Sequence, residues 1–320
     1  MEDKGLNRRQ ALGLSAGAIA GAALVPGTAA AQNNERRERR RAPEDLVPQQ
    51  NIGIQLYTLR DLQAQQPNGV ENLIQNLARI GIREVELFTL QGRTAAQWRQ
   101  ILVNNDVRAI AAHVGIDRWR SQLDTVLDEA VTIGMPYVGV PGIFDATRPT
   151  TAAGYRRLSR EFNEFGEAAA ERGLKFYYHN HDFEFARAAN GTRFFDIMLE
   201  NTEPDLVFWE LDLYWAVTAG VDPLDYLNTY DQARFPLFHV KDRSATQVMG
   251  ANFADLGEGN INFERIFRAL ENKQYHHYII ERDTQVNPLQ TAETGYEYLR
   301  ELRGRRVRAP YTPSEAGQRI

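Results

Sequence analysis

The sequence predicts a single-domain α/β fold, a closed (β/α)8 barrel of the TIM type. Short apolar runs rich in β-forming residues recur from residue 51 onward, and amphipathic stretches with helical periodicity separate them. No glycine-rich phosphate-binding loop follows the first run. A barrel is therefore favoured over a doubly wound nucleotide-binding sheet.

Eight apolar runs are predicted to be the parallel strands of this barrel. They cover residues 52–57, 84–88, 109–113, 137–140, 174–179, 206–212, 237–240 and 277–281. Helices are predicted in the stretches between them, at 70–80, 95–104, 119–133, 155–172, 194–200, 223–230 and 263–271. Gly81, Gly134 and Gly173 fall where a helix must end before the next strand. No linker interrupts the series, so we expect one barrel over residues 51–305.

Both ends of the chain are expected to lie outside the barrel. The Arg8-Arg9 pair, the apolar small-residue run 12–25 and the alanines at 29–31 resemble a bacterial twin-arginine signal, which predicts a cleaved signal peptide over residues 1–31. The run is short and rich in Gly and Ala, so no stable membrane span is expected after cleavage. Residues 32–50 are interpreted as a disordered tether and 306–320 as a C-terminal tail. The expected location is periplasmic or extracellular.

Composition limits the chemistry and the partners. The formal net charge is -5 and the sequence pI is about 5.8, whereas binding to phosphates needs a basic surface, so no nucleic-acid partner is expected. The chain contains no Cys, which excludes disulfides, thiolate metal ligands and a Cys nucleophile. Any transition-metal site must therefore use His and carboxylate ligands.

Polar residues end several of the predicted strands, at the face where barrel enzymes carry their active sites. This set comprises Glu84, Glu86, His113, His179, His181, Glu210, Asp212, His239, Glu281 and Asp283. His276 and His277 precede a strand and are expected at the opposite face. One such His or Glu alone is more commonly a satisfied buried polar group. Several together, with like charges such as Asp212 and Glu281 converging, favour a cation between them.

The sequence resembles the xylose-isomerase-like sugar isomerase and epimerase barrels. The matching stretches are 53–57, 178–185, 211–215, 238–242, 256–259 and 280–281, and the most specific signal is His-x-Lys-Asp at 239–242 followed by Leu-Gly-Glu-Gly at 256–259. The resemblance implies one divalent metal ion, Mn, Zn, Co or Mg, held by residues from strands five to eight. It places three of these ligands on Asp212, His239 and Glu281.

The ligand from strand five is where the chain departs from the pattern implied by the resemblance. Most members carry Glu at the position that is His179 here. His179, His181 and Glu184 are therefore the three candidates, and strand alternation puts the two histidines on one side. We expect Glu184 to be the fourth metal ligand and His181 to lie beside the substrate.

Other residues at the predicted mouth are candidates for catalysis. Lys241 lies two residues after His239 and could stabilise a developing oxyanion, or form a salt bridge with a neighbouring carboxylate. His113 and Glu86 could bind sugar hydroxyls or act as acid and base. Five aromatic residues could pack against a sugar face or simply form the wall, namely Tyr57, Phe88, Phe183, Tyr214 and Trp215.

The resemblance implies an isomerase, epimerase or lyase that removes a proton next to a carbonyl and passes through an enediolate intermediate. The expected partner is a small carbohydrate, a free keto-sugar or a 3-keto-glycoside, because phosphorylated sugars are chiefly cytoplasmic. A homo-oligomer is left open. Two alternatives are a catalytically silent sugar-binding barrel and a metal-dependent hydrolase related to the three-zinc endonuclease barrels. Metal content separates the three functions. The isomerase, epimerase or lyase should hold about one equivalent of metal, the binding barrel none and the hydrolase about three.

Overall fold

Eight parallel strands form the centre of the folded unit Pro43–Arg305. The computed structural model describes residues 44–64, 68–244, 252–284 and 287–304. The predicted signal peptide at 1–31 and the predicted tail at 306–320 lie outside these described residues. The barrel strands are β2 (Ile52–Gln55), β3 (Glu84–Leu87), β4 (Arg108–Ala112), β5 (Tyr137–Val140), β6 (Lys175–His179), β7 (Val207–Asp212), β8 (Leu237–Val240) and β11 (His277–Ile280).

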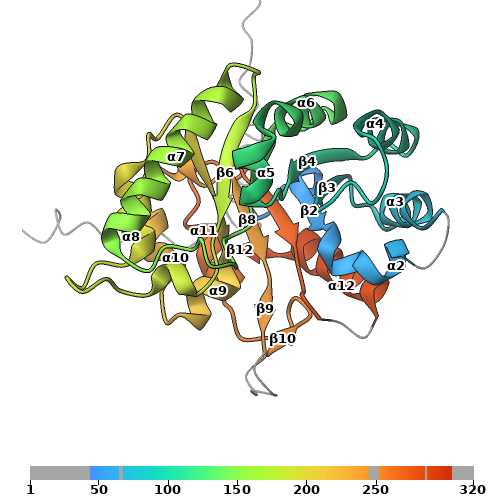
Figure 1. The fold of residues 1–320 in the computed structure, drawn as a ribbon. Coiled ribbons are helices and arrows are strands. Elements are labelled where there is room, and N and C mark those ends of the chain that lie inside the picture. The colour runs from blue at the N-terminus through green and yellow to red at the C-terminus, as the bar shows by residue number, and fades with distance from the viewer. Residues whose placement is uncertain (1–43, 65–67, 245–251, 285–286, 305–320) are drawn as a thin grey trace, which may run out of the picture. The chain divides into compact units, whose positions relative to one another are not determined.

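The eight strands curve into a nearly closed barrel (Figure 1). Their order is β4-β3-β2-β11-β8-β7-β6-β5, and every pairing in this sheet is parallel. The first and last strands of this order are joined by a parallel bridge between His113 and Gly139, where the Val114 amide donates to the Gly139 carbonyl at 2.8 Å. The prediction of a (β/α)8 barrel is confirmed, and each predicted strand overlaps an observed one.

Helices surround the strands (Figure 1). They are α2 (Arg60–Ala64), α3 (Gly69–Ile80), α4 (Ala95–Asn104), α5 (Ile116–Ser121), α6 (Leu123–Ile133), α7 (Ala152–Ala170), α8 (Phe194–Asn201), α9 (Leu213–Thr218), α10 (Pro223–Leu227), α11 (Phe263–Arg268) and α12 (Pro288–Glu301). Helices α3 and α6 end at Gly81 and Gly134, whose φ angles of +112° and +89° favour glycine. Within the described residues, no helix is long and apolar enough to cross a bilayer.

The helix predicted over 119–133 is broken in the structure. Gln122 has φ -142° and ψ 37°, which separates α5 from α6. Trp119 on α5 packs against helix α7 and strand β6. Its ring centroid lies 5.2 Å from that of Phe165 and 4.8 Å from that of Phe176. Helix α6 packs instead against α4. The helices α2, α9 and α12 were not among the predicted elements.

A layer of apolar side chains inside the barrel lies directly below the polar mouth residues. Tyr177, Leu237 and Ile279 belong to one interior cluster, and each precedes a mouth residue, His179, His239 or Glu281, by two positions. Because side chains alternate along a strand, residues two apart share a face. The packed layer therefore forms the floor on which the polar residues stand.

The N-terminal boundary of the fold differs from the prediction, because residues 44–50 are part of the folded unit and not of a tether. Strand β1 (Glu44–Asp45) pairs antiparallel with β12 (Arg303–Gly304), and the short helix η1 (Gln49–Asn51) leads into β2. Leu46 is fully buried, and its amide donates to the Leu302 carbonyl at 3.2 Å. The segment lacks periodicity because only two apolar residues, Leu46 and Val47, anchor it.

Replacing Leu46 with alanine should therefore lower the free energy of unfolding by about 2–5 kcal/mol, the usual cost of a cavity at a buried leucine. Urea unfolding of the purified chain measures this. The control is Val103→Ala on α4, because Val103 is 64% exposed and its loss should stay within about 0.5 kcal/mol. Equal effects of the two substitutions would show that residues 44–47 do not pack against the barrel.

Candidate metal centre

Six strands bring their polar residues together at the carboxyl end of the barrel. Glu86 comes from β3, His179 from β6, Glu210 and Asp212 from β7 and His239 from β8, while His113 and Glu281 directly follow β4 and β11. Except for His113, each of these residues is buried. The predicted convergence of Asp212, His239 and Glu281 is present in the structure.

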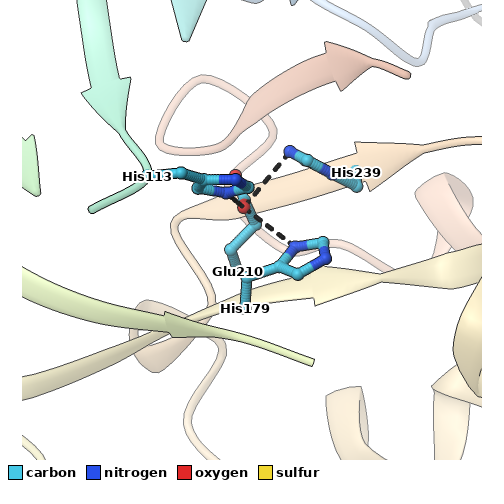
Figure 2. A group of neighbouring side chains, drawn as sticks. All are labelled: His113, His179, Glu210 and His239. Carbon is cyan, nitrogen blue, oxygen red and sulfur yellow. Dashed lines mark hydrogen bonds and ion pairs between the residues drawn. The ribbon is translucent and has the colours of Figure 1, made fainter. Parts of the chain in front are cut away.

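Glu210 lies at the centre of a lower group with three imidazoles (Figure 2). Its Oε2 atom is 2.8 Å from His113 Nε2, 3.0 Å from His179 Nδ1 and 3.2 Å from His239 Nε2. Glu86 lies beside this group, with Oε2 at 2.7 Å from His239 Nε2. Two carboxylates therefore face the same side of the histidine rings.

An upper group lies on the other side of two of these rings. His239 Nδ1 is 2.9 Å from Glu281 Oε2 and 3.8 Å from Asp212 Oδ2, and His179 Nε2 is 3.9 Å from Asp212 Oδ2. The other Asp212 oxygen, Oδ1, accepts a hydrogen bond from the Trp215 amide at 2.9 Å and caps α9. Among the described residues, Asp212 Oδ2 has no hydrogen-bond partner.

The residues of the upper group fit a divalent cation. Their ligand atoms lie within 4.8 Å of one another, and two imidazole nitrogens with two carboxylates suit Zn, Mn or Co. A cation would give Asp212 Oδ2, which has an ion pair with Lys241 at 3.6 Å but no hydrogen bond, a direct partner. Metal-bound histidines usually donate their second ring nitrogen to a carboxylate, and here Glu210 and Glu86 occupy those positions on His179 and His239.

The ligand atoms of the lower group also lie within 4.8 Å of one another. This group consists of His113, His179, Glu210 and His239. Because the two groups share His179 and His239, they do not make two independent sites. The upper group has the stronger claim, since it contains two carboxylates rather than one and leaves Glu86 and Glu210 free to orient the rings.

Burial and mutual contacts shift the pKa values of these residues in opposite directions. Burial, together with the neighbouring His239, lowers the pKa of His179 to about 3, so its ring is neutral and has a free lone pair. Burial raises the pKa of Asp212 to about 7, although Lys241 and His239 act against this. For His239, burial is outweighed by Glu210, Glu281 and Glu86, so its pKa is raised. A cation at this position would compete with the His239 proton.

Glu184, the expected fourth ligand, is not part of either group. It lies in the short helix η3 (Phe183–Phe185), where Oε1 accepts a hydrogen bond from the Tyr178 hydroxyl and Oε2 accepts one from the His181 amide at 2.8 Å. Its carboxylate fixes the loop after β6, and burial raises its pKa to about 7. The geometry favours His179 in its place, because the ring of His179 belongs to both groups.

The remaining predicted residues lie around this centre in three different ways. His113 and His181 line the cavity at the barrel mouth, and the His181 ring stacks on Phe183 with centroids 5.5 Å apart. Lys241 is buried, with Nζ at 2.8 Å from Glu281 Oε2 and 2.9 Å from Asp283 Oδ1, so it makes the salt-bridge contact that the sequence left as one option. Glu86 lies beneath the rings and does not line the cavity.

The cavity above the centre has a volume of about 640 Å³. His179, Glu281 and Asp283 form its polar inner part, and aromatic side chains form much of its wall. Of the aromatic residues expected at the mouth, Tyr57, Phe88, Phe183 and Trp215 line it, whereas Tyr214 does not.

Several residues of the site were given no role from the sequence. Glu210 was among the polar residues expected at the mouth, and it shares its strand face with Asp212, two positions later, but no contact was assigned to it. Gln55 donates through Nε2 to Glu86 at 2.7 Å, and the Tyr177 hydroxyl donates to the other Glu86 oxygen. Phe144 lies in the loop after β5, outside any apolar run, so no periodicity marks it.

Comparison with known proteins identifies the family. Residues 74–302 match the family described as the xylose isomerase-like TIM barrel. The chain belongs to this family. The resemblance seen in the sequence motifs is thereby confirmed, and the barrel of the xylose isomerase-like family is the fold described above.

Individual relatives agree with this assignment. Inosose dehydratase of Clostridium perfringens is 29% identical over 178 residues, which cover 50% of this chain and 58% of that protein, so the chain spans less than two thirds of the length of this curated relative. A sugar phosphate isomerase/epimerase from Parabacteroides distasonis has a TM-score of 0.66 at 23% identity, over 80% of this chain and 96% of that chain. IolI protein with a zinc atom has a TM-score of 0.61 at 12% identity, over 78% and 96%. The two structures are similar in fold.

Proposed function

We propose that the chain is a divalent-metal-dependent enzyme, an isomerase, epimerase or lyase, that removes a proton next to the carbonyl of a keto-sugar. The observation that carries this proposal is the two-sided arrangement of His179 and His239. Each ring has a carboxylate below it, and each turns its other nitrogen toward Asp212 or Glu281 at the edge of the cavity.

The proposed ligand atoms are His179 Nε2, Asp212 Oδ2, His239 Nδ1 and Glu281 Oε2, which replaces Glu184 by His179 in the set expected from the sequence. The proposed cation is one of Mn, Zn, Co or Mg. When bound, it polarises the substrate carbonyl and acidifies the adjacent carbon-bound proton. The zinc atom of the similar IolI structure supports this proposal.

Asp283 is the proposed proton acceptor, because its carboxylate lines the cavity beside Glu281. Burial and the charge of Glu281 raise the pKa of Asp283, which makes it a stronger base than an ordinary aspartate. Lys241 holds Asp283 Oδ1 at 2.9 Å and so orients the carboxylate. Lys241 is thus a positioning residue in this proposal.

His113 and His181 are the proposed contacts to the sugar hydroxyls. Burial lowers the pKa of His181 well below its usual value, so its ring is neutral and can accept a hydrogen bond. Burial also acts on His113, but Glu86 and Glu210 outweigh it and raise the pKa of His113, whose Nε2 lies 2.8 Å from Glu210 Oε2. The dehydratase relatives favour the elimination branch, in which a leaving group departs from the neighbouring carbon.

The test combines metal analysis with proton exchange. The purified chain should contain about one equivalent of divalent metal. In deuterated water, NMR with a panel of keto-sugars should show loss of the proton next to the carbonyl, whichever product is finally released. Asp283→Asn should slow this exchange by about 100-fold or more while metal content stays unchanged.

Each alternative has its own outcome. Sugar binding with no metal and no exchange would establish a silent binding barrel, and about three equivalents of metal would favour the hydrolase. Unchanged exchange in Asp283→Asn would move the proton acceptor to His113 or His181.

A further inference from the structure

Two exposed aromatic rings stand at the rim of the cavity. Among the described residues, the large apolar side chains that are exposed are Tyr57 (39%), Val103 (64%), Val131 (48%) and Phe144 (64%). The two aromatic residues both line the cavity above the metal centre, and the two aliphatic ones do not. Aromatic surface left in water beside a polar site is the kind of surface that a ligand covers.

Each of the two rings is fixed by its neighbours. The Tyr57 ring stands edge to face against Phe88, with centroids 5.4 Å apart, and the Arg60 guanidinium lies 4.1 Å from its centre. The Phe144 ring stands edge to face against His181 at 4.8 Å and against Phe183 at 5.9 Å. The rings are therefore held in place before any ligand arrives, which lowers the entropy cost of binding.

The two rings lie in the loops that follow the strands, whereas the proposed reaction centre lies at the strand ends. His179 is the last residue of β6 and is 2% exposed, whereas Tyr57 follows the end of β2 by two residues and Phe144 follows the end of β5 by four. The cavity volume of about 640 Å³ lies within the range of roughly 300–1,000 Å³ found for drug-sized ligands. A cavity of this size accommodates a ligand larger than one sugar ring.

The charges that line the cavity do not provide a binding site for a phosphate group. The carboxylates of Asp182, Glu281 and Asp283 face a single guanidinium, that of Arg148. Arg148 also lies over the Phe183 ring at 4.3 Å. Lys241 pairs with Glu281 and Asp283, and Glu281 is also a proposed metal ligand, so the charges left toward the outer cavity are Asp182 and Arg148. One charge of each sign is not the cluster of cations that a phosphate group needs, whereas a neutral sugar needs none.

Resting on the proposed function, we infer that the substrate is a neutral glycoside of two rings. Its keto-sugar ring occupies the inner part of the cavity, and its second sugar ring packs against Tyr57 and Phe144. These two residues select for the second ring and take no part in the proton transfer. The apolar face of a sugar ring packs well on an aromatic ring, and the rim offers two exposed aromatic rings for this contact.

The test is a binding measurement that needs no turnover. Titration calorimetry with the metal-loaded chain compares glucose and glucose 6-phosphate with cellobiose, maltose, lactose, sucrose and trehalose. At least one disaccharide should bind about 100-fold more tightly than glucose, since each of the two aromatic contacts is worth about a factor of ten. Glucose 6-phosphate should bind no more tightly than glucose.

Variants at the rim identify the residues responsible. Phe144→Ala and Tyr57→Ala should each remove about tenfold of the disaccharide affinity and leave glucose binding within about twofold. Phe144→Tyr keeps a ring and should retain the preference. Val131→Ala is the matched control, because Val131 is exposed but lies outside the cavity, and it should change neither affinity.

The inference is overturned if no disaccharide binds more tightly than glucose, if both alanine variants keep the preference, or if the phosphate group tightens binding. Its failure is distinct from failure of the proposed function. Metal binding with proton exchange but without disaccharide preference removes only the outer subsite. A disaccharide preference without metal or exchange supports the subsite and removes the proposed reaction.

Discussion

Replacing His179 with alanine should lower the affinity of the chain for divalent metal by about 100-fold or more. Loss of a carboxylate that merely orients a ligand commonly costs 10–100-fold, and loss of a ligand should cost at least as much. His179 has two roles in the arrangement, since Nε2 faces Asp212 and Nδ1 is held by Glu210 at 3.0 Å. Alanine removes both.

Glu184→Gln is the informative comparison, because Glu184 was the ligand expected from the sequence. The amide is nearly isosteric, and it can still accept one of the two hydrogen bonds that Glu184 receives from Tyr178 and His181. We expect this variant to keep its metal affinity within about tenfold. Its main effect should be a less ordered loop after β6 and weaker binding of sugar by His181.

Competition with a metal-binding dye measures both affinities without any substrate. Circular dichroism of the two variants confirms that each barrel is folded, as expected for residues at the mouth. Greater metal loss in Glu184→Gln than in His179→Ala would restore Glu184 as the ligand and contradict the assignment made from the structure.

The sequence was sufficient for the barrel because each βα unit carries its own signal. Apolar runs of four to seven residues correspond to strands at every predicted place, and Gly81 and Gly134 mark two helix ends through their positive φ angles. The prediction failed at the N-terminal boundary, where the ordering contact joins residues that are far apart in the sequence. Residues 44–47 are ordered by strand β12, more than 250 positions later, and no local pattern reports such a pairing.

The site was predictable to the extent that strand parity determines it. Asp212, His239 and Glu281 follow from their positions at strand ends, and the structure brings them together. The choice between His179 and Glu184 depends on how the loop after β6 folds back. In the structure, that loop is closed by the hydrogen bonds of Glu184 to Tyr178 and His181, which involve the carboxylate itself. Hydrogen bonding within a loop leaves no periodic trace in a sequence.

Asp212→Asn is expected to stabilise the metal-free protein at mildly alkaline pH. Burial raises the pKa of Asp212 from 3.8 to about 7 in the folded chain, whereas the unfolded chain releases this proton near 3.8. Between these values the folded state binds a proton that the unfolded state has lost, so the free energy of unfolding falls as pH rises from about 4 to about 7 and stays low above it. Asparagine carries no charge and escapes this loss, which amounts to at most about 4 kcal/mol.

The substitution leaves the local structure intact, since Asn caps a helix as well as Asp and can still accept the Trp215 amide hydrogen bond. Asp222→Asn is the matched control: Asp222 also caps a helix, α10, but the bond to Arg265 lowers its pKa, so this variant should gain no stability.

Metal should offset much of the stability difference between the parent chain and Asp212→Asn. At a concentration 100 times its Kd, a ligand that binds only the folded state adds about 2.7 kcal/mol to the free energy of unfolding. The parent chain should gain this at roughly pH 8, because the cation would neutralise Asp212 and contact the Oδ2 atom, which has no hydrogen-bond partner. The variant should gain little, because an amide is a far weaker ligand. Urea unfolding at about pH 4 and about pH 8, with chelator or with added metal, measures all four differences. Equal stabilisation of parent and variant by metal would show that the cation binds elsewhere.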